Sequence, residues 1–92
     1  SENLSKLRSM ELRHNFLGDA GAVLLAQSGG FGNLKELKLG WNEIRDAGAL
    51  AFAESGKMPK LEKLDLRGNF LSDETKTALK KSLSNFKSLR LY

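Results

Sequence analysis

The chain has 92 residues, which corresponds to one domain or part of one. It contains no cysteine and a single histidine, which excludes disulfides, thiolate chemistry and any site built from several histidine ligands. Fifteen Lys and Arg against eleven Asp and Glu give a net charge of +4, too small an excess to predict nucleic-acid binding by itself.

Three consecutive segments share one pattern when the chain is shifted against itself by 27 residues: Asn15, Asn42 and Asn69 then coincide. A period of this length is typical of a solenoid. A fourth, partial copy follows, with apolar residues from Leu83 onward. We therefore divide a single domain spanning 1–92 into repeats at about 4–30, 31–57 and 58–82, followed by a terminal partial repeat at 83–92.

Each repeat begins with a short segment in which leucine or methionine alternates with polar residues. The alternating pairs are Met10 with Leu12, Leu37 with Leu39, and Leu64 with Leu66. This period of two predicts a strand with one buried face. The same alternation at the end of the chain predicts a fourth strand.

An Ala- and Leu-rich stretch follows the first two strands, at Asp19–Ser28 and Asp46–Ser55. The acidic residue that opens each stretch predicts a helix start, because a carboxylate is favoured at the positive end of the helix dipole. Gly29 and Gly56 follow these stretches and predict a glycine stop.

The third helix is predicted to begin at the cap Ser72-Asp73-Glu74 and to run to about Ser84. Gly21 and Gly48, in the first turns of the other two helices, are expected to let those helices lie close to the sheet.

The sequences of the repeats resemble those of a known family. The segments GDAGA (18–22) and RDAGALAFAESG (45–56) resemble bacterial leucine-rich repeats, and LRGNFLSDETKTALKKSL (66–83) is similar to the closing repeat of the ribonuclease-inhibitor-like class, including that of the Ran GTPase-activating protein. The resemblance implies an α/β leucine-rich-repeat solenoid, a short horseshoe with parallel strands on the concave face, helices on the convex face and no cofactor.

Asn15, Asn42 and Asn69 fall where the chain turns off each strand. A side chain that both donates and accepts hydrogen bonds can satisfy the backbone groups that a tight turn leaves unpaired, so we interpret all three as structural turn residues. The alternative is an amide ligand for a bound molecule.

The two ends of the solenoid differ in polarity. The third helix carries Lys76 and Lys80 where the first two carry alanines, which predicts that it is the last helix in the stack. The first helix has no charge after Asp19. We therefore expect either that preceding repeats cover this end or that the chain associates with itself through it.

Residues between the buried leucines form rows across neighbouring strands. One row, Glu11, Lys38, Asp65 and Arg90, alternates in sign at every step. Opposite charges on adjacent strands stabilise each other, so the row predicts a charge ladder that fixes the register. A charged docking surface is the other interpretation, and the two are compatible.

A second group gathers at the C-terminal edge of the strands, where Trp, Tyr and Arg are typical of binding hot spots. Phe16 and Phe70 follow on the adjacent loops, and these aromatic residues either bind a partner or cover the ends of the core. Gly40 and Gly68 flank Trp41 in sequence and register, which leaves room for its ring. The predicted binding residues are Arg13, His14, Lys38, Trp41, Asp65, Arg67, Arg90 and Tyr92.

The leading hypothesis is a non-enzymatic protein–protein interaction module that uses its concave face and C-terminal strand edge. The alternatives are a capping or self-assembling unit and, on the resemblance alone, a regulator of a GTPase. No residue set predicts catalysis, a metal or a cofactor, and neither nucleic-acid nor membrane binding is expected. We expect a cytoplasmic (intracellular) location, because extracellular relatives usually have disulfide-bonded caps.

Overall fold

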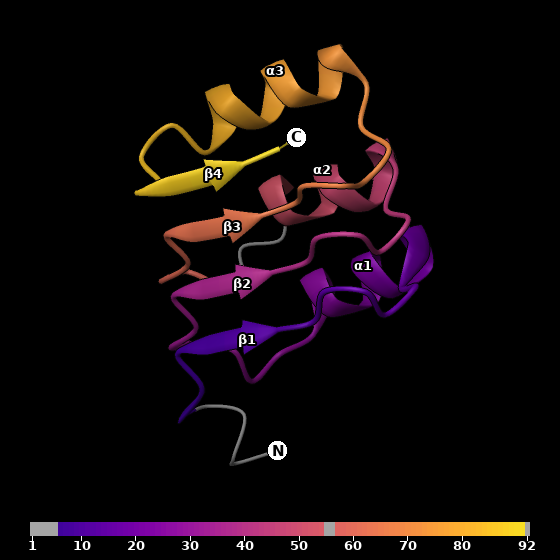
Figure 1. Ribbon diagram of the computed structural model, residues 1–92. Helices are drawn as coiled ribbons and strands as arrows, with labels where there is room; N and C mark the ends of the chain where they lie inside the picture. The colour runs from indigo at the N-terminus through magenta and orange to yellow at the C-terminus, as the bar shows by residue number, and fades with distance from the viewer. Residues whose placement is uncertain (1–5, 55–56, 92) are drawn as a thin grey trace.

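The computed structural model describes residues 6–54 and 57–91 (Figure 1). Strands alternate with helices along the whole chain. The elements in order are β1 (Ser9–Glu11), α1 (Gly18–Gln27), β2 (Glu36–Lys38), α2 (Asp46–Glu54), β3 (Lys63–Asp65), α3 (Asp73–Ser82) and β4 (Ser88–Arg90).

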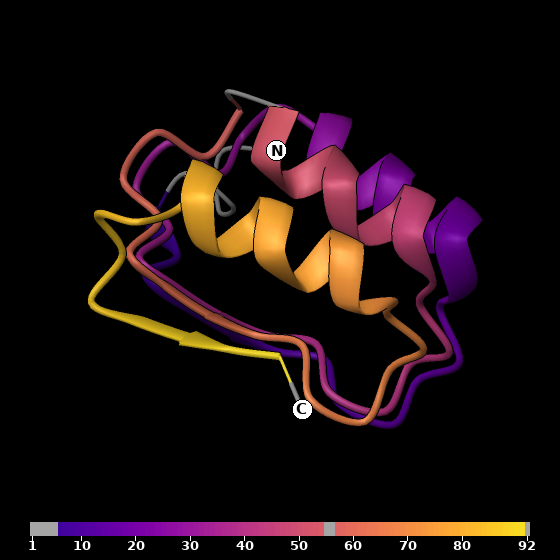
Figure 2. The same ribbon diagram turned by 90° about the horizontal axis from the view of Figure 1, so that it is seen from above.

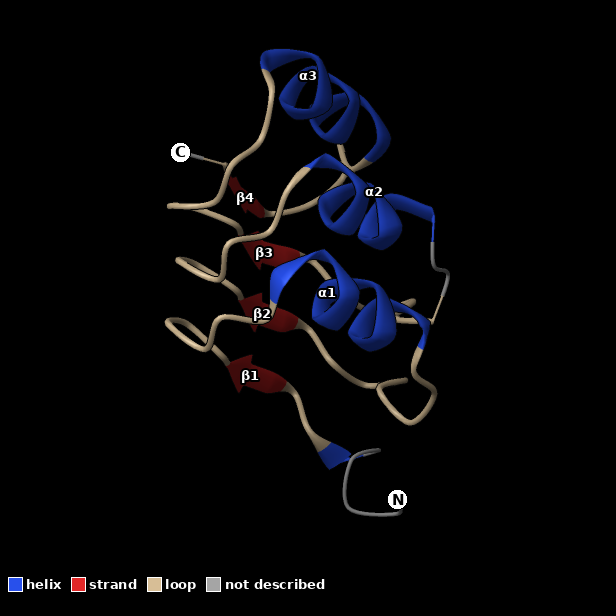
Figure 3. Cartoon of the chain, turned by 90° about the vertical axis from the view of Figure 1, so that its right-hand side faces the viewer, coloured by secondary structure: helices blue, strands red, loops and turns tan. Residues whose placement is uncertain are grey.

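The four strands form one parallel sheet in the order β1-β2-β3-β4, and the helices cover one face of it (Figure 2). The helices stack in the same order as the strands, so each repeat adds one layer to both (Figure 3). Glu36 lies opposite Ser9 and Lys63, and Lys38 lies opposite Glu11 and Asp65, as the 27-residue period predicts. The expected α/β repeat solenoid is confirmed.

The core lies between the sheet and the helices. It is built from the recurrent leucines, and Leu34, Leu37 and Leu39 in the second repeat have no exposed surface. Full burial of one such side chain contributes about 1.5–3 kcal/mol. The alternation of buried and polar positions leaves the other face of the sheet, which we call the concave face, to polar and charged side chains.

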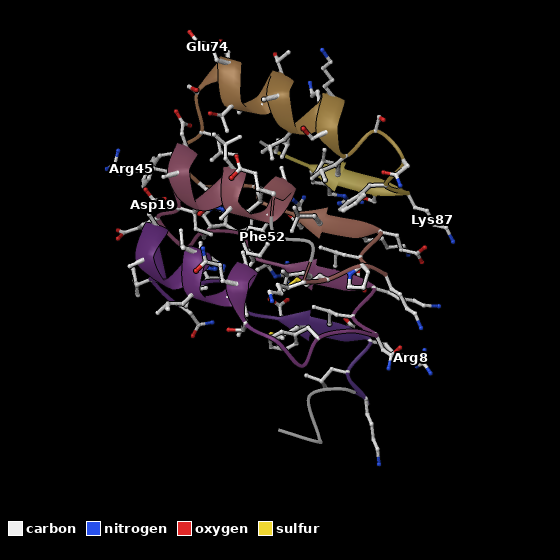
Figure 4. All side chains as sticks on the ribbon, turned by 180° about the vertical axis from the view of Figure 1, so that it is seen from behind. Arg8, Asp19, Arg45, Phe52, Glu74 and Lys87 are labelled. Atoms are coloured by element: carbon white, nitrogen blue, oxygen red, sulfur yellow. The ribbon has the colours of Figure 1, made fainter. Side chains whose placement is uncertain are left out.

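The acidic helix-opening residues lie in the first turns of α1 and α2 as predicted, but their hydrogen bonds reach the next repeat. Asp19 does not cap its own helix: its Oδ1 accepts hydrogen bonds from the amides of Arg45 and Gly48, at the start of α2 (2.7 and 3.0 Å). Figure 4 shows Asp19 beside Arg45 at this end of the helices. Asp46 likewise accepts from the amide of Ser72, ahead of α3 (2.9 Å). Each acidic residue therefore stabilises the next repeat.

Two glycine predictions also need correction. Gly48 allows a close approach of helix to helix: a Cβ there would lie 2.6 Å from Asp19 Oδ1 and 3.0 Å from Ala22 Cβ, both on α1. The helix α1 ends because Ser28 is extended, and the positive φ that follows is at Gly30 (93°) rather than at Gly29. Gly56 lies outside the described residues.

The third helix begins as predicted, with the Ser72 hydroxyl accepting from the Thr75 amide (3.2 Å), and it ends at Ser82, two residues earlier than expected. Its lysine stripe is solvated only in part: Lys80 is exposed and Lys76 is half-buried, whereas the equivalent Ala26 and Ala22 are fully buried. None of the helices in residues 6–54 and 57–91 is long and apolar enough to cross a membrane. The same residues contain no cluster of side chains suited to a metal ion.

Candidate functional site

The turns that leave the strands are held by the repeated asparagines. The buried Asn42 side chain accepts from the amides of Asn15 and Leu17 in the preceding turn (2.8 and 3.3 Å) and donates to the carbonyls of Leu12, Leu39 and Gly40. Asn69 accepts in the same way from two amides of the second turn. These bonds join consecutive turns, so the residues around them occupy fixed places at the sheet edge.

Immediately before each asparagine the backbone is left-handed: φ is 63° at His14, 55° at Trp41 and 75° at Gly68. This conformation is uncommon for residues with a side chain. Here it turns the His14 and Trp41 rings toward each other, stacked with centroids 5.2 Å apart and planes 10° apart. Gly68 gives the Trp41 ring its space, because a Cβ at Gly68 would lie 2.3 Å from Trp41 Nε1.

Three large aromatic side chains stand out from this edge. Phe16 is 76% exposed, Phe70 is 55% exposed and Trp41 is 43% exposed. The idea that the two phenylalanines cover the ends of the core is therefore wrong. Their neighbours are cationic: the Arg45 guanidinium lies 5.1 Å from the Phe70 ring centroid, and that of Arg67 lies 5.9 Å from the Trp41 ring centroid. We call His14, Phe16, Trp41 and Phe70 the aromatic edge.

A groove of about 400 Å³ crosses the concave face over β2, β3 and β4. Within residues 6–54 and 57–91, the charged lining consists of six cationic side chains and two anionic ones: Arg13, Lys38, Lys63, Arg67, Lys87 and Arg90, with Glu36 and Asp65. The groove meets the aromatic edge at Arg67, which lines the former and faces Trp41 in the latter.

The acidic residues of the alternating row do not pair across the strands as the predicted charge ladder requires. The Glu11 carboxylate accepts hydrogen bonds from the backbone amide and from the guanidinium of Arg13, at the end of the same strand (2.8 and 2.6 Å). Asp65 pairs in the same way with Arg67 (2.9 Å). The ion pairs thus run along each strand, because an arginine two residues on extends over the same face.

These pairs set the charge state of the site. Burial of Asp65 opposes ionisation, but hydrogen bonds from the Arg67 side chain and amide outweigh it, with further attraction from Arg67 and Arg90, and the pKa of Asp65 lies below its ordinary value. The hydrogen bond from the Arg13 side chain lowers the pKa of Glu11. Both carboxylates are therefore charged at neutral pH, and each is hydrogen-bonded to its neighbouring arginine.

The cations opposite them are left without such partners. Within the described part of the chain, Lys38, Lys63 and Arg90 form no ion pair and no side-chain hydrogen bond. Of the remaining lining residues, Glu36 accepts a hydrogen bond from the Ser9 hydroxyl (3.3 Å), and Lys87 lies 3.6 Å from Glu62. The groove thus presents net positive charge, with Lys38 and Arg90 attracted to Glu11 and Asp65 but in no direct pair with them.

The structure divides the predicted binding residues into two adjoining groups. Arg13, Lys38, Asp65, Arg67 and Arg90 line the groove, and His14 and Trp41 belong to the aromatic edge. Tyr92 lies outside the described residues.

The prediction missed Glu36, Lys63 and Lys87 as groove residues. Glu36 and Lys63 occupy the neighbouring row of outward positions on β2 and β3, so the two-residue alternation was the signal that pointed to them. Lys87 precedes β4, and its place in the groove depends on how the chain returns from α3.

Comparison with family models matches a "Leucine Rich repeat" at residues 3–26 and 33–53 and a "Leucine Rich Repeat" at residues 60–89. No curated protein matches the chain in a sequence search. Leucine-rich repeats are generally protein-interaction modules and are typically not enzymes. With repeats matched over most of its length and their strands joined in a single parallel sheet, the chain belongs to the leucine-rich repeat proteins.

Proposed function

We propose that the chain is a protein-interaction module that binds an acidic segment of its partner in the concave groove and an apolar residue of that partner at the aromatic edge. The observation that carries this proposal is the groove lining, in which six cationic side chains face two anionic ones. A groove of this sign favours an anionic ligand and accelerates its association.

The internal ion pairs support the proposal because they do not remove the positive charge. Arg13 and Arg67 each have one carboxylate neighbour, which leaves Lys38, Lys63 and Arg90 to attract a ligand. Lys38 and Arg90 lie on either side of Asp65 in register, so a carboxylate of the partner can approach each of them across the groove. Charges in a groove are screened less than charges on an open surface.

The aromatic edge supplies the apolar part of the interface. Trp41 and Phe16 are exposed, Trp41 lies beside Arg67, and Trp and Arg are among the residues most enriched in binding hot spots. The stack on His14 fixes the Trp41 ring before a partner arrives, which reduces the entropy lost on binding. Four short strands offer a small surface, and we expect an interface of about 1,200 Å², at the low end for specific complexes.

A protein ligand is favoured over single-stranded nucleic acid by the composition of the groove. Sites for single strands combine positive charge with aromatic platforms on which bases stack. Among the described residues, no aromatic side chain lines the groove, and one face of the Trp41 ring is already stacked on His14.

The test is titration of the chain with a short Glu-rich peptide that contains one phenylalanine, followed by the fluorescence of Trp41, the single tryptophan. We expect saturable binding that weakens with added salt. Lys38→Ala with Arg90→Ala should weaken it about tenfold, equivalent to about 1.4 kcal/mol. Trp41→Phe, followed by calorimetry, should lose affinity while the salt dependence stays the same.

The matched control is Lys80→Ala with Lys81→Ala, which removes the same charge from α3, outside the groove lining. Equal weakening in this control would show that only the net charge attracts the peptide, and the proposed groove would be rejected. Tighter binding of a single-stranded RNA than of the peptide would reject a protein ligand.

A further inference from the structure

The outward-facing residues of β2, β3 and β4 form a grid of two rows on the floor of the groove (Figure 1). The first row is Lys38, Asp65 and Arg90, and the second is Glu36, Lys63 and Ser88. Cations alternate with acids at every neighbouring position of this grid except at Ser88, which is neutral. An acid at that position would separate Lys63 from Arg90, so its absence leaves the positive charge concentrated around it.

Three cations of the grid lie close enough together to bind one anion. Neighbouring parallel strands are about 4.8 Å apart, and residues two apart on one strand are about 6.6 Å apart. The Cα atoms of Lys38, Lys63 and Arg90 therefore form a triangle with sides of about 8–10 Å. The long, flexible side chains of lysine and arginine reach the centre of such a triangle. We call these three residues the cation triangle.

The charges of the cation triangle are available to a ligand. Lys63 and Arg90 are exposed and Lys38 is half-buried, and within the described residues none of the three is in an ion pair or a side-chain hydrogen bond. Glu11 and Asp65 attract Lys38 and Arg90, respectively, but without direct contact. A ligand that brings negative charge therefore meets donors that no other group has already bound.

The carboxylates nearest the cation triangle are already bound by other groups. Asp65 accepts hydrogen bonds from the guanidinium of Arg67, farther along the same strand end, and its side chain is only 11% exposed. Glu36 accepts a hydrogen bond from the Ser9 hydroxyl (3.3 Å). An anion above β3 therefore meets three unpaired cations, while the carboxylate beneath it is paired with a fourth.

A phosphoryl group matches this arrangement better than a carboxylate does. It carries a charge of about −1.5 to −2 at pH 7 and has three strong acceptor oxygens, so a single group can bind all three cations. A carboxylate has one charge and two oxygens. A nucleic-acid phosphodiester likewise carries one charge for each phosphate. The cation triangle therefore favours a phosphate monoester.

We infer that the acidic segment of the partner contains a phosphorylated serine or threonine, whose phosphoryl group binds above β3 between Lys38, Lys63 and Arg90. The inference rests on the proposed function, because it names the chemical group that anchors the acidic segment in the groove. Phosphorylation of the partner then controls the interaction, since the same segment without the phosphoryl group offers the cation triangle no dianion.

The test compares three short peptides of the same length, each with one phenylalanine, in calorimetric titrations of the full chain at pH 7.5. The first has a central Gly-Ser-Gly with the serine phosphorylated, the second is the same peptide without the phosphoryl group, and the third has Glu-Gly-Glu at the centre. The first and third carry nearly the same charge. We expect the phosphopeptide to bind about tenfold more tightly than the Glu-Gly-Glu peptide, because one group bonds to all three cations.

Substitutions at Ser88 test the position of the phosphoryl group. Ser88→Asp completes the alternation of charge and should abolish the preference for the phosphopeptide, whereas the neutral Ser88→Asn should keep it. Lys63→Ala should weaken the phosphopeptide more than the Glu-Gly-Glu peptide. The control Lys80→Ala removes the same charge from α3, outside the groove lining, and should leave the ratio of the two affinities unchanged.

The outcomes separate this inference from the proposed function. Equal affinities of the phosphopeptide and the Glu-Gly-Glu peptide, or equal effects of Ser88→Asp and Ser88→Asn, would overturn the inference and leave the acidic ligand standing. Binding of neither peptide would reject the proposed function and the inference with it. Tighter binding of single-stranded RNA, or of vesicles that contain a phosphoinositide, than of the phosphopeptide would overturn the assignment to a phosphorylated protein.

Discussion

At the scale of single residues, the Asn42 side chain makes five hydrogen bonds to the backbone. This fully buried side chain bonds to backbone groups of two successive repeats, and Asn69 makes equivalent bonds one repeat on. Among the described residues, no buried side-chain polar atom is left without a partner. The turns that carry the aromatic edge therefore depend on the side-chain amides of Asn42 and Asn69.

Replacing Asn42 should be correspondingly costly. Asn42→Ala leaves the amides of Asn15 and Leu17 without partners, and each buried unsatisfied group costs about 1–3 kcal/mol. The carbonyls that Asn42 also binds, those of Leu12, Leu39 and Gly40, keep the donors Asn15, Asn69 and His14. We expect a loss of about 3 kcal/mol in the free energy of unfolding, measured in urea. Asn15→Ala, at an exposed position with fewer partners, is the control and should cost much less. Equal losses would contradict the proposed role of burial.

Gly68 is the residue on which the placement of Trp41 depends. Gly68→Ala introduces a Cβ 2.3 Å from Trp41 Nε1 at a φ of 75°, so we expect a loss of about 1–2 kcal/mol and a shifted Trp41 emission spectrum. Gly32→Ala is the matched control, since no atom lies within 4 Å of its added Cβ and its φ is not positive. An unchanged emission spectrum in Gly68→Ala would show that the ring has room elsewhere.

The strand β3 contributes a nearly buried carboxylate, that of Asp65, to the lining of the groove. The Asp65 side chain is 11% exposed and is held by Arg67 on the same strand end. Desolvation acts against its ionisation, yet the hydrogen bonds from Arg67 prevail and the pKa is lowered. A group whose pKa is lower in the folded state binds fewer protons there than in the unfolded chain, so stability falls as pH falls.

This gives a pH dependence that can be measured. The stabilisation from Asp65 is fully present above the unfolded value of about 3.9 and is lost as pH falls through its lower folded pKa. Between about pH 5 and pH 3, Asp65→Asn should lose less stability than the unchanged chain. Glu54→Gln, which removes one carboxylate at the exposed end of α2, is the control. Parallel curves for all three proteins would contradict the role given to Arg67.

The helices are coupled in chain order. Each acidic opening residue stabilises the start of the following helix, and Gly48 lets α2 approach α1 closely. Stability in such a stack is the sum of the repeats and of the interfaces between neighbours. Within the described residues, the first and the last layer therefore each lack one neighbouring repeat. The two layers differ in the polarity of the surface that faces solvent.

For the whole molecule, the lysines of α3 keep one end of the stack polar, while at the other end Leu24 on α1 is 70% exposed. Lys76→Ala with Lys80→Ala should give α3 the alanine face of the other helices and permit head-to-tail association through Leu24. Light scattering should then show a mass that rises with concentration.

The control for this change is Lys81→Ala with Lys87→Ala, which removes the same charge at positions that the other helices do not fill with alanine. It should stay at the mass of the unchanged chain. Association in both variants would mean that reduced charge alone is responsible, and the stacking argument would fail.

The repeat architecture and strand register were predictable because they follow from local periodicity. Alternating leucines define which face of each strand is buried, and the 27-residue period sets which residues lie side by side across β1 to β4. The recurrent asparagines could be interpreted from their residue type alone, since a tight turn leaves backbone groups that an amide can satisfy. The same patterns predicted five of the groove residues.

The pairing of charged groups could not be predicted, because it depends on side-chain reach in three dimensions. The row of alternating charges suggested pairs across strands, yet Arg13 and Arg67 are long enough to turn back onto Glu11 and Asp65. Asp19 and Asp46 cap the next helix for the same reason, since stacking brings that helix within hydrogen-bond distance. Periodicity fixes which residues share a face, whereas packing between repeats decides which of their polar atoms meet.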